Sequence, residues 1–225
     1  MSEHLVRLTE AMRKTGLGGR SGKLLYSSLP TLAAGPVYLL GYNPGGEPDH
    51  ETTSILSHLH DAGQAATNEY LDVAWQTRTC SWAVGEAPLQ RRVKYLLTGI
   101  GLDVRSVCAS NLIFVRSRGE KHLASAAQMA TACWPVHRLI LDIVRPTMIL
   151  TFGRKVADFI VGKAEKSKLA GSKLSGHGNW ECFANSIVLN GRSISLVSLP
   201  HLSRYNINGH AEVIAWVKTE MTIPS

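Results

Sequence analysis

Asn43 is the residue whose setting first suggests chemistry. It stands in the string Gly-Tyr-Asn-Pro-Gly (41–45), directly after the apolar run 36–40. The proline stiffens the turn, and the glycine lets a ligand approach the backbone closely. An amide is no general base, but it can hold and orient a water molecule. The string predicts either a water-orienting turn at a ligand site or a plain Asn-Pro turn that ends a strand.

Two further polar residues belong to apolar runs: Asn111 lies within the run 107–114, and His201 ends the run 194–201. These runs are typical of buried strands, and the segments around them carry the apolar spacing of helices. We expect strands at 36–40, 107–114, 147–153 and 194–201, and helices at 3–15, 89–97, 121–144, 154–161 and 211–221. Strands that alternate with helices indicate a parallel sheet covered on both faces. The sequence therefore predicts an α/β fold, with three α/β/α layers around a central, mostly parallel four-stranded sheet.

The carboxyl ends of parallel strands are where open α/β sheets bind their ligands. Asn43 follows the predicted strand 36–40, Asn111 lies in the second half of 107–114, and His201 is the last residue of 194–201. We therefore expect these three side chains to meet at one edge of the sheet.

The remaining segments predict one domain over 1–225, with an N-terminal helix and linker in residues 1–30. The glycine-rich stretch 16–23 resembles a phosphate-binding loop, but Leu17 and Leu24 break the required pattern, and a helix precedes it instead of a strand. We interpret it as a flexible helix stop and linker. Residues 163–179, which include Lys166 and Lys168, have the composition of an exposed basic loop.

Charge and cysteine usage narrow the partners and the compartment. The 225 residues carry a net charge of +7, which favours a polyanion such as nucleic acid. The four cysteines include no CxxC pair, so no zinc or iron–sulfur site is expected. The N-terminus lacks the pattern of a signal peptide, and no apolar stretch approaches the roughly 18 residues that span a bilayer. We expect a soluble cytoplasmic protein that has no contact with the membrane.

Four segments in this order resemble the motifs of the uracil-DNA glycosylase superfamily. The string at 41–45 is similar to the G-x-N-P-G form of the first motif, found in the mismatch-specific and single-strand-selective branches. Ser-Asn-Leu-Ile (110–113) resembles the strand end whose Asn pairs with the flipped base. Pro-Thr-Met-Ile-Leu-Thr-Phe-Gly (146–153) is similar to a P-x-x-I-x-x-x-G strand, and Leu-Pro-His-Leu-Ser-Arg (199–204) resembles a shortened last motif. The resemblance spans about residues 36–207.

The resemblance implies a DNA glycosylase that everts a pyrimidine nucleotide and hydrolyses its base–sugar bond without a metal or organic cofactor. In that family the motif Asn or Asp positions the attacking water, which gives this role to Asn43. His201 becomes the candidate hydrogen-bond donor to the base O2, and Asn111 the reader of the polar edge of the base. The implied partner is DNA, and we expect a monomer in the cytoplasm, associated with the nucleoid.

The resemblance also implies residues around the base and along the DNA. Further base-binding candidates are Tyr42, Gly45, Gly46 and Phe114, and the aromatic platform is left open between Tyr42, Phe114 and Trp75. Candidate DNA contacts are Ser203, Arg204, Tyr205, Lys166 and Lys168. A small residue at position 45 or 46 leaves room for a substituent at C5 of the pyrimidine. The substrate stays open between uracil, a mispaired or oxidised base, and a bulky 5-modified cytosine such as those of some phage genomes.

The last motif departs from the family pattern, because it lacks the P-S-P or P-S-G insert. If Pro200 matches the family proline, Leu199 takes the histidine position; if the loop is simply shorter, His201 fills it. The alternative function is a catalytically weak or inactive protein of the same fold that binds DNA or a modified base. An unrelated small-molecule hydrolase ranks last, because the sequence lacks a Ser or Cys nucleophile elbow.

Overall fold

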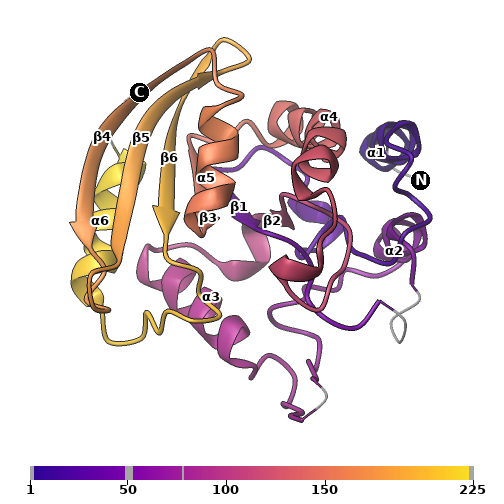
Figure 1. The fold of residues 1–225 in the computed structure, drawn as a ribbon, viewed down its shortest axis with the longest axis horizontal. Coiled ribbons are helices and arrows are strands. Elements are labelled where there is room, and N and C mark those ends of the chain that lie inside the picture. Colours follow the sequence, from indigo (N-terminus) through magenta and orange to yellow (C-terminus); the bar gives the residue numbers. More distant parts are fainter. Residues whose placement is uncertain (1–2, 49–52, 78, 223–225) are drawn as a thin grey trace.

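A mixed sheet forms the centre of the protein, seen in a computed structural model that describes residues 3–48, 53–77 and 79–222. Its strand order within these residues is β2-β1-β3-β6-β5-β4 (Figure 1). The parallel strands are β1 (Val37–Gly41), β2 (Cys108–Asn111), β3 (Met148–Phe152) and β6 (Arg192–Leu199), and the antiparallel ones are β5 (Glu181–Leu189) and β4 (Lys166–Leu174). The α/β class is confirmed, and the four predicted strands form the parallel part. The predicted size of the sheet is wrong, because the β4–β5 hairpin extends it beyond β6.

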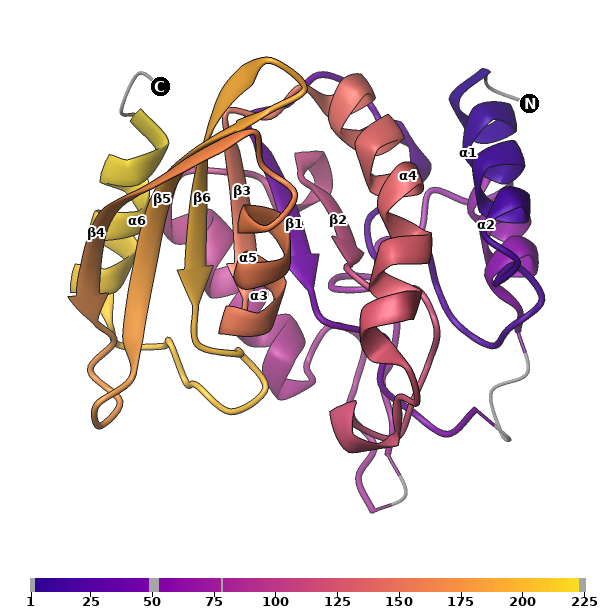
Figure 2. The same ribbon diagram turned by 45° about the horizontal axis from the view of Figure 1, so that its top comes forward.

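Helices cover both faces of the parallel strands (Figure 2). On one face lie α3 (Pro88–Gly99) and α6 (Ala211–Thr222), and on the other α4 (Ala126–Val144) and α5 (Arg154–Val161). The helix α1 (Glu3–Lys14) packs against α4, and α2 (Ile55–Ala62) packs against α1. Short 3-10 turns occupy Leu29–Thr31, Val104–Ser106 and Glu120–His122. The three-layer arrangement is therefore as predicted.

The strand β1 shows why its sequence is an unbroken apolar run. Successive side chains of a strand point to opposite faces, and helices cover both faces here. Tyr38 and Leu40 enter the core beneath α4 and α5, whereas Val37 and Leu39 enter the core beneath α3 and α6. All four are buried, so none of these side chains is accessible to a ligand.

The stretch 16–23, predicted as a flexible linker, is held by backbone hydrogen bonds near its end, because the Arg116 N–H donates to the Ser21 carbonyl over 2.8 Å and the Lys23 N–H to the Phe114 carbonyl over 3.0 Å. The chain that follows it is fixed as well. Leu24 and Leu25 are buried, the Tyr26 N–H donates to the Ala109 carbonyl over 2.8 Å, and the Ala109 N–H donates to Ser27 Oγ over 2.9 Å. These contacts lie along β2, which is an edge strand of the sheet. The linker therefore covers hydrogen-bonding groups that an edge strand would otherwise expose.

The predicted basic loop 163–179 is also wrong over most of its length, because residues 166–174 form β4. This strand pairs with β5, and all nine of its residues are polar, glycine, alanine or solvent-exposed leucine, so the alternation that marks a half-buried strand is missing. Lys166 pairs with Val188 and Lys168 with Ser186, at the end of the hairpin that lies away from the carboxyl end of β6.

Candidate functional site

The carboxyl ends of the four parallel strands come together at one edge of the sheet. Gly41 of β1 pairs with Asn111 of β2, and Phe152 of β3 pairs with Leu199 of β6. Asn43 and His201 each follow their strand by two residues, so both lie beyond this edge, as predicted. Neighbouring strands are about 4.8 Å apart, which places His201, two strands from β1, at roughly 10 Å from the first motif.

The side chain of Asn43 is fixed by hydrogen bonds at its nitrogen. Nδ2 donates to the carbonyl of Pro44 over 2.8 Å, to Oγ of Ser117 over 2.9 Å, and to the carbonyl of Val115 over 3.4 Å. Because two of these partners are carbonyl oxygens, which only accept, the atom that faces them must be the NH₂ group. None of the hydrogen bonds that the structure describes for Asn43 uses Oδ1, and this oxygen is therefore available to hold a water.

Asn111 lies at the bottom of the edge, with 7% of its surface exposed. Among the described residues its side-chain amide has no hydrogen-bond partner. A Cβ atom on Gly41 would stand 2.1 Å from its Oδ1, so the amide rests directly against a backbone that only glycine leaves open. The next peptide is held firmly, because the Leu112 N–H donates to the Gly41 carbonyl over 2.9 Å and His137 Nε2 donates to the Leu112 carbonyl over 2.9 Å. A nearly buried amide with donor and acceptor both free suits a polar ring edge.

His201 carries its proton on the nitrogen that faces away from its own loop. The backbone N–H of Ser203 donates to Nδ1 over 3.1 Å, so Nδ1 is an acceptor and the neutral ring is protonated at Nε2. Burial lowers the pKa of His201, the positive charge of Arg204 lowers it further, and Glu120 opposes them. The side chain also lies against Gly153 at the end of β3, where a Cβ atom would stand 3.8 Å from it. His201 is therefore a neutral Nε2–H donor near pH 7.

An ion pair that the sequence did not predict bridges the two sides of this edge. Lys155 Nζ contacts the Glu120 carboxylate, which joins the start of α5 to the turn that follows β2. Burial raises the pKa of Tyr42, Glu120 raises it further and Lys155 lowers it, so both charges act on Tyr42. Glu120 also acts on His201. The pair thus lies in electrostatic range of both the first motif and the histidine, and its long sequence separation left no signal that reasoning from the sequence could use.

Two cavities flank these residues. The first, of about 430 Å³, shares Val115 and Ser117 with the hydrogen-bond partners of Asn43 and is lined by Arg20, Arg116 and Arg118. The second, of about 300 Å³, is lined by His201 and by Glu181 and Phe183 at the start of β5. Asn111 lines neither cavity. Asn43 lines neither cavity either. The structure therefore places Asn43 just beyond β1 and Asn111 at the end of the adjacent strand β2, and it places His201 on the far side of β3.

Two of the arginines that line the first cavity already have partners within the protein. Arg116 is buried and its Nη1 donates to the Gly45 carbonyl, and Arg118 pairs with Glu47. Gly45 itself faces open space, because a Cβ atom there would meet nothing within 4 Å. Gly46 has a φ of 113°, a backbone conformation that favours glycine.

Two predicted contacts are wrong in this structure because the side chains are buried. Phe114 has no exposed surface, and its ring packs 4.8 Å from that of His137. Tyr205 is also fully buried, and its hydroxyl donates to the Ser175 carbonyl over 2.7 Å. Phe114 therefore supports the core beneath Asn111 and presents no ring to a base, and Tyr205 ties the 200–205 loop to the β4–β5 turn without reaching DNA.

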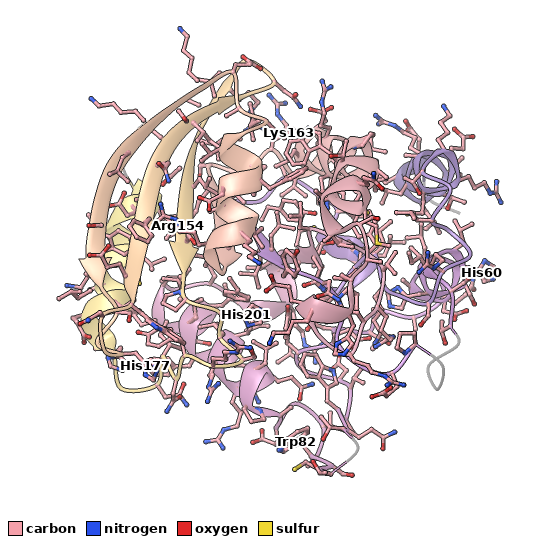
Figure 3. All side chains as sticks on the ribbon, viewed as in Figure 1. His60, Trp82, Arg154, Lys163, His177 and His201 are labelled. Carbon is pink, nitrogen blue, oxygen red and sulfur yellow. The ribbon has the colours of Figure 1, made fainter. Side chains whose placement is uncertain are left out.

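The other predicted residues differ in position. Tyr42 is partly exposed at the site edge and keeps its candidacy as a platform, whereas Trp75 packs with Tyr26 and Tyr70 and donates from Nε1 to Glu69 over 3.2 Å. Ser203 and Arg204 are exposed beside His201. Lys166 and Lys168 lie on β4 far from this edge, so the expectation that they join the same DNA-binding surface is wrong; in Figure 3, Lys163 likewise lies at the opposite end of α5 from His201.

Comparison with known proteins adds no relative. No protein-family model matches the chain, and a search of the curated proteins finds no match. Within residues 3–48, 53–77 and 79–222 there is no group of three or more His, Cys, Asp or Glu side chains that could hold a metal ion. Over the same ranges no helix is both long and apolar enough to cross a membrane.

Proposed function

We propose that the protein is a monofunctional DNA glycosylase that hydrolyses the base–sugar bond of an everted pyrimidine nucleotide. One observation carries the proposal. The amide of Asn43, whose oxygen is available to hold a water, follows β1 by two residues, and the neighbouring strand β2 ends at the nearly buried amide of Asn111, which has no side-chain partner among the described residues. The first group suits a nucleophilic water, and the second suits the edge of a pyrimidine. The resemblance of the sequence motifs gives the same two roles.

The reaction divides between the three polar residues. Asn43 Oδ1 accepts a hydrogen bond from a water, whose oxygen attacks C1′ of the sugar while the C1′–N1 bond breaks. The bonding electron pair leaves with the base, and the water gives its proton to solvent or to the departing base. His201 donates from Nε2 to the base O2, where negative charge develops. A neutral donor is sufficient for this step, because it stabilises the anion without transferring its proton.

The charge around the edge fits a DNA strand. Arg20 lines the cavity beside Asn43, where Arg116 and Arg118 are engaged by Gly45 and Glu47, and Arg154 and Arg204 line the cavity beside His201. Guanidinium groups bind phosphate oxygens and hold the strand in register while one nucleotide leaves the stack. Lys155, which lies at the same edge, is paired with Glu120, so it is not a free amine for a covalent lyase step. Buried free thiols at Cys108, Cys133 and Cys182 agree with action in the reducing cytoplasm.

A base-release screen tests the proposal. The full chain is incubated with oligonucleotides that carry uracil, mismatched thymine, hydroxymethylcytosine or glucosylated hydroxymethylcytosine, in single and double strands, and abasic sites are revealed by alkali. We expect release from at least one of these substrates, and loss of release in Asn43→Ala. If no substrate yields abasic sites, the glycosylase proposal fails. The alternative, a non-catalytic protein that binds DNA or a modified base, then takes its place.

A further inference from the structure

The cavity beside His201 has a lining unlike that of the cavity beside Asn43. Trp180 is 39% exposed, and Arg154 lies over the ring of Phe183 at 4.2 Å from its centroid. Both line the same hollow of about 300 Å³ as His201 and Arg204. Nucleobases stack on aromatic rings such as an indole and on guanidinium planes. Figure 3 shows Arg154 beside β5 and β6, with His201 and His177 along the lower rim.

The indole of Trp180 is held in place by the protein. The ring of His177 packs 4.7 Å from it, and the Ser175 N–H donates to the Trp180 carbonyl over 2.8 Å. The Tyr205 hydroxyl in turn holds the Ser175 carbonyl. Because Tyr205 belongs to the loop that carries His201, the platform and the histidine are tied to one another. A stacking surface fixed before binding loses little conformational entropy when a ligand arrives.

The charged groups that line this cavity favour the base of a nucleotide over its phosphate group. Glu181 lines it together with Arg154 and Arg204. A carboxylate repels phosphate, whereas it accepts hydrogen bonds from the amino or ring N–H groups of a base. The volume lies at the small end of the range of about 300–1,000 Å³ typical of ligand pockets, which suits one ring better than a chain.

We propose that the cavity formed by Trp180, Phe183, Arg154 and Glu181 binds an unpaired nucleobase next to the everted nucleotide in the same DNA strand. This inference rests on the proposed function, since it takes the everted nucleotide to lie at His201. A neighbouring base can enter the cavity only after it has left the duplex stack. The preferred substrate is therefore single-stranded or locally opened DNA.

The test measures coupling between Trp180 and one base. Fluorescence anisotropy is recorded with a labelled single-stranded oligonucleotide that has a stable abasic analogue at its centre, and with versions that lack one further base on either side. Removing the base that enters the cavity should weaken binding to the natural chain and leave binding to Trp180→Ala unchanged. Trp180→Ala should bind the parent oligonucleotide about fivefold to a hundredfold more weakly, and Trp180→Phe should retain most of the affinity. Leu169→Ala removes an even more exposed apolar side chain of the same hairpin, outside the cavity, and should have no effect.

The outcomes separate this inference from the proposed function. If Trp180→Ala binds as tightly as the natural chain, or loses affinity equally for every oligonucleotide, the cavity is not a base subsite, whatever the base-release screen shows. If the coupling to one flanking base is present and no substrate is cleaved, the subsite stands and the glycosylase proposal fails. A greater than tenfold preference for duplex over single strands would also overturn the inference.

Discussion

The backbone N–H of Ser203 donates to Nδ1 of His201 over 3.1 Å, and the Ser203 hydroxyl lies 2.8 Å from the same nitrogen. Two groups of a single loop residue, Ser203, thereby select the tautomer of the histidine. Second-sphere partners of this kind commonly decide which ring nitrogen can donate to a ligand. The loop 201–203 consequently determines that Nε2, and not Nδ1, is the nitrogen of His201 that can donate a hydrogen bond.

This relationship predicts unequal effects for the two side chains. His201→Ala should lower the single-turnover excision rate about a hundredfold to a thousandfold, as expected for loss of a donor to a developing anion. Ser203→Ala keeps the backbone donor and should lower the rate only about threefold to tenfold, the worth of one ordinary hydrogen bond. Rates are measured by alkali cleavage on the best substrate of the screen. Equal losses in both variants would show that Ser203 acts on the DNA and not through the ring.

The pKa of His201 should depend on Arg204. Burial and then the charge of Arg204 lower it from its ordinary value near 6.5, so the ring stays neutral at pH 7 and takes up a proton only in more acidic solution. Arg204→Gln removes one of these causes, and the titration midpoint should move upward toward the ordinary value. The imidazole Cε1–H resonance, followed by NMR against pH, reports this directly. Arg154→Gln serves as the control, and an equal shift there would refute the assignment to Arg204.

Gly41→Ala should mimic the loss of Asn111. The new methyl group would stand 2.1 Å from Asn111 Oδ1, and the amide can swing away at little cost to the fold because it is the end of a side chain. We expect an excision rate about tenfold to a hundredfold lower, close to that of Asn111→Ala, since misplacement by an ångström has effects of this size. The melting temperature should change little. Gly171→Ala, where a Cβ atom meets nothing within 4 Å, is the matched strand control.

Asn43→Asp should not improve the enzyme. A carboxylate is a better acceptor for water, but at this position it would face the carbonyl oxygens of Pro44 and Val115, to which the amide now donates. Repulsion between these oxygens should turn the side chain and lower the rate at pH 7, by about a hundredfold for a misoriented water. Ser117→Ala removes only one acceptor and should cost less. A faster Asn43→Asp enzyme would contradict the hydrogen-bond pattern described for this turn.

Stability should fall in mild acid because of buried histidines. Burial lowers the pKa of His137 to about 4, and Tyr38 Oη and the Leu112 carbonyl, each at 2.9 Å, hold the neutral ring. The unfolded chain binds a proton near pH 6.5, so the contribution is complete above that pH and is lost as the pH falls toward 4. At pH 5 the loss should be about 2 kcal/mol for this residue. His58, whose pKa burial also lowers to about 4, acts in the same direction. Urea unfolding at pH 7.5 and pH 5 measures the sum, and His137→Gln should reduce the difference.

The parallel strands could be predicted from the sequence because burial on both faces leaves an unmistakable apolar run. The bounds of β1 and β3 fall within one residue of expectation at each end, while β2 stops at Asn111, earlier than the predicted 114. The helix α2 and the hairpin strands were missed. Polar and apolar residues alternate only weakly along the sequence of β5, and β4 is exposed along most of its length. Their pairing depends on contacts between the two strands, which no local sequence pattern records.

The sequence could predict which residues lie at the candidate site, because the ends of the parallel strands determine their positions. Asn43, Asn111 and His201 lie at the predicted edge because parallel strands share their polarity. Which atoms they offer was not predictable, since Ser117 and Ser203 act through turn geometry. Phe114 and Tyr205 were misassigned because an aromatic residue next to a motif has the same sequence signature whether it faces a ligand or the core.

The two edge strands of the sheet are protected in different ways from pairing with another chain. The linker 21–27 occupies the free side of β2, whereas β4 carries Lys166, Lys168 and Lys173 along the opposite border. An open border of this kind is a template on which another molecule can add a strand, and lysines there oppose such growth by repulsion and solvation. Lys166 and Lys168, which were predicted to bind DNA, are thus well placed to prevent aggregation. A chain shortened at its N-terminus through the linker 21–27 would lose the cover of β2.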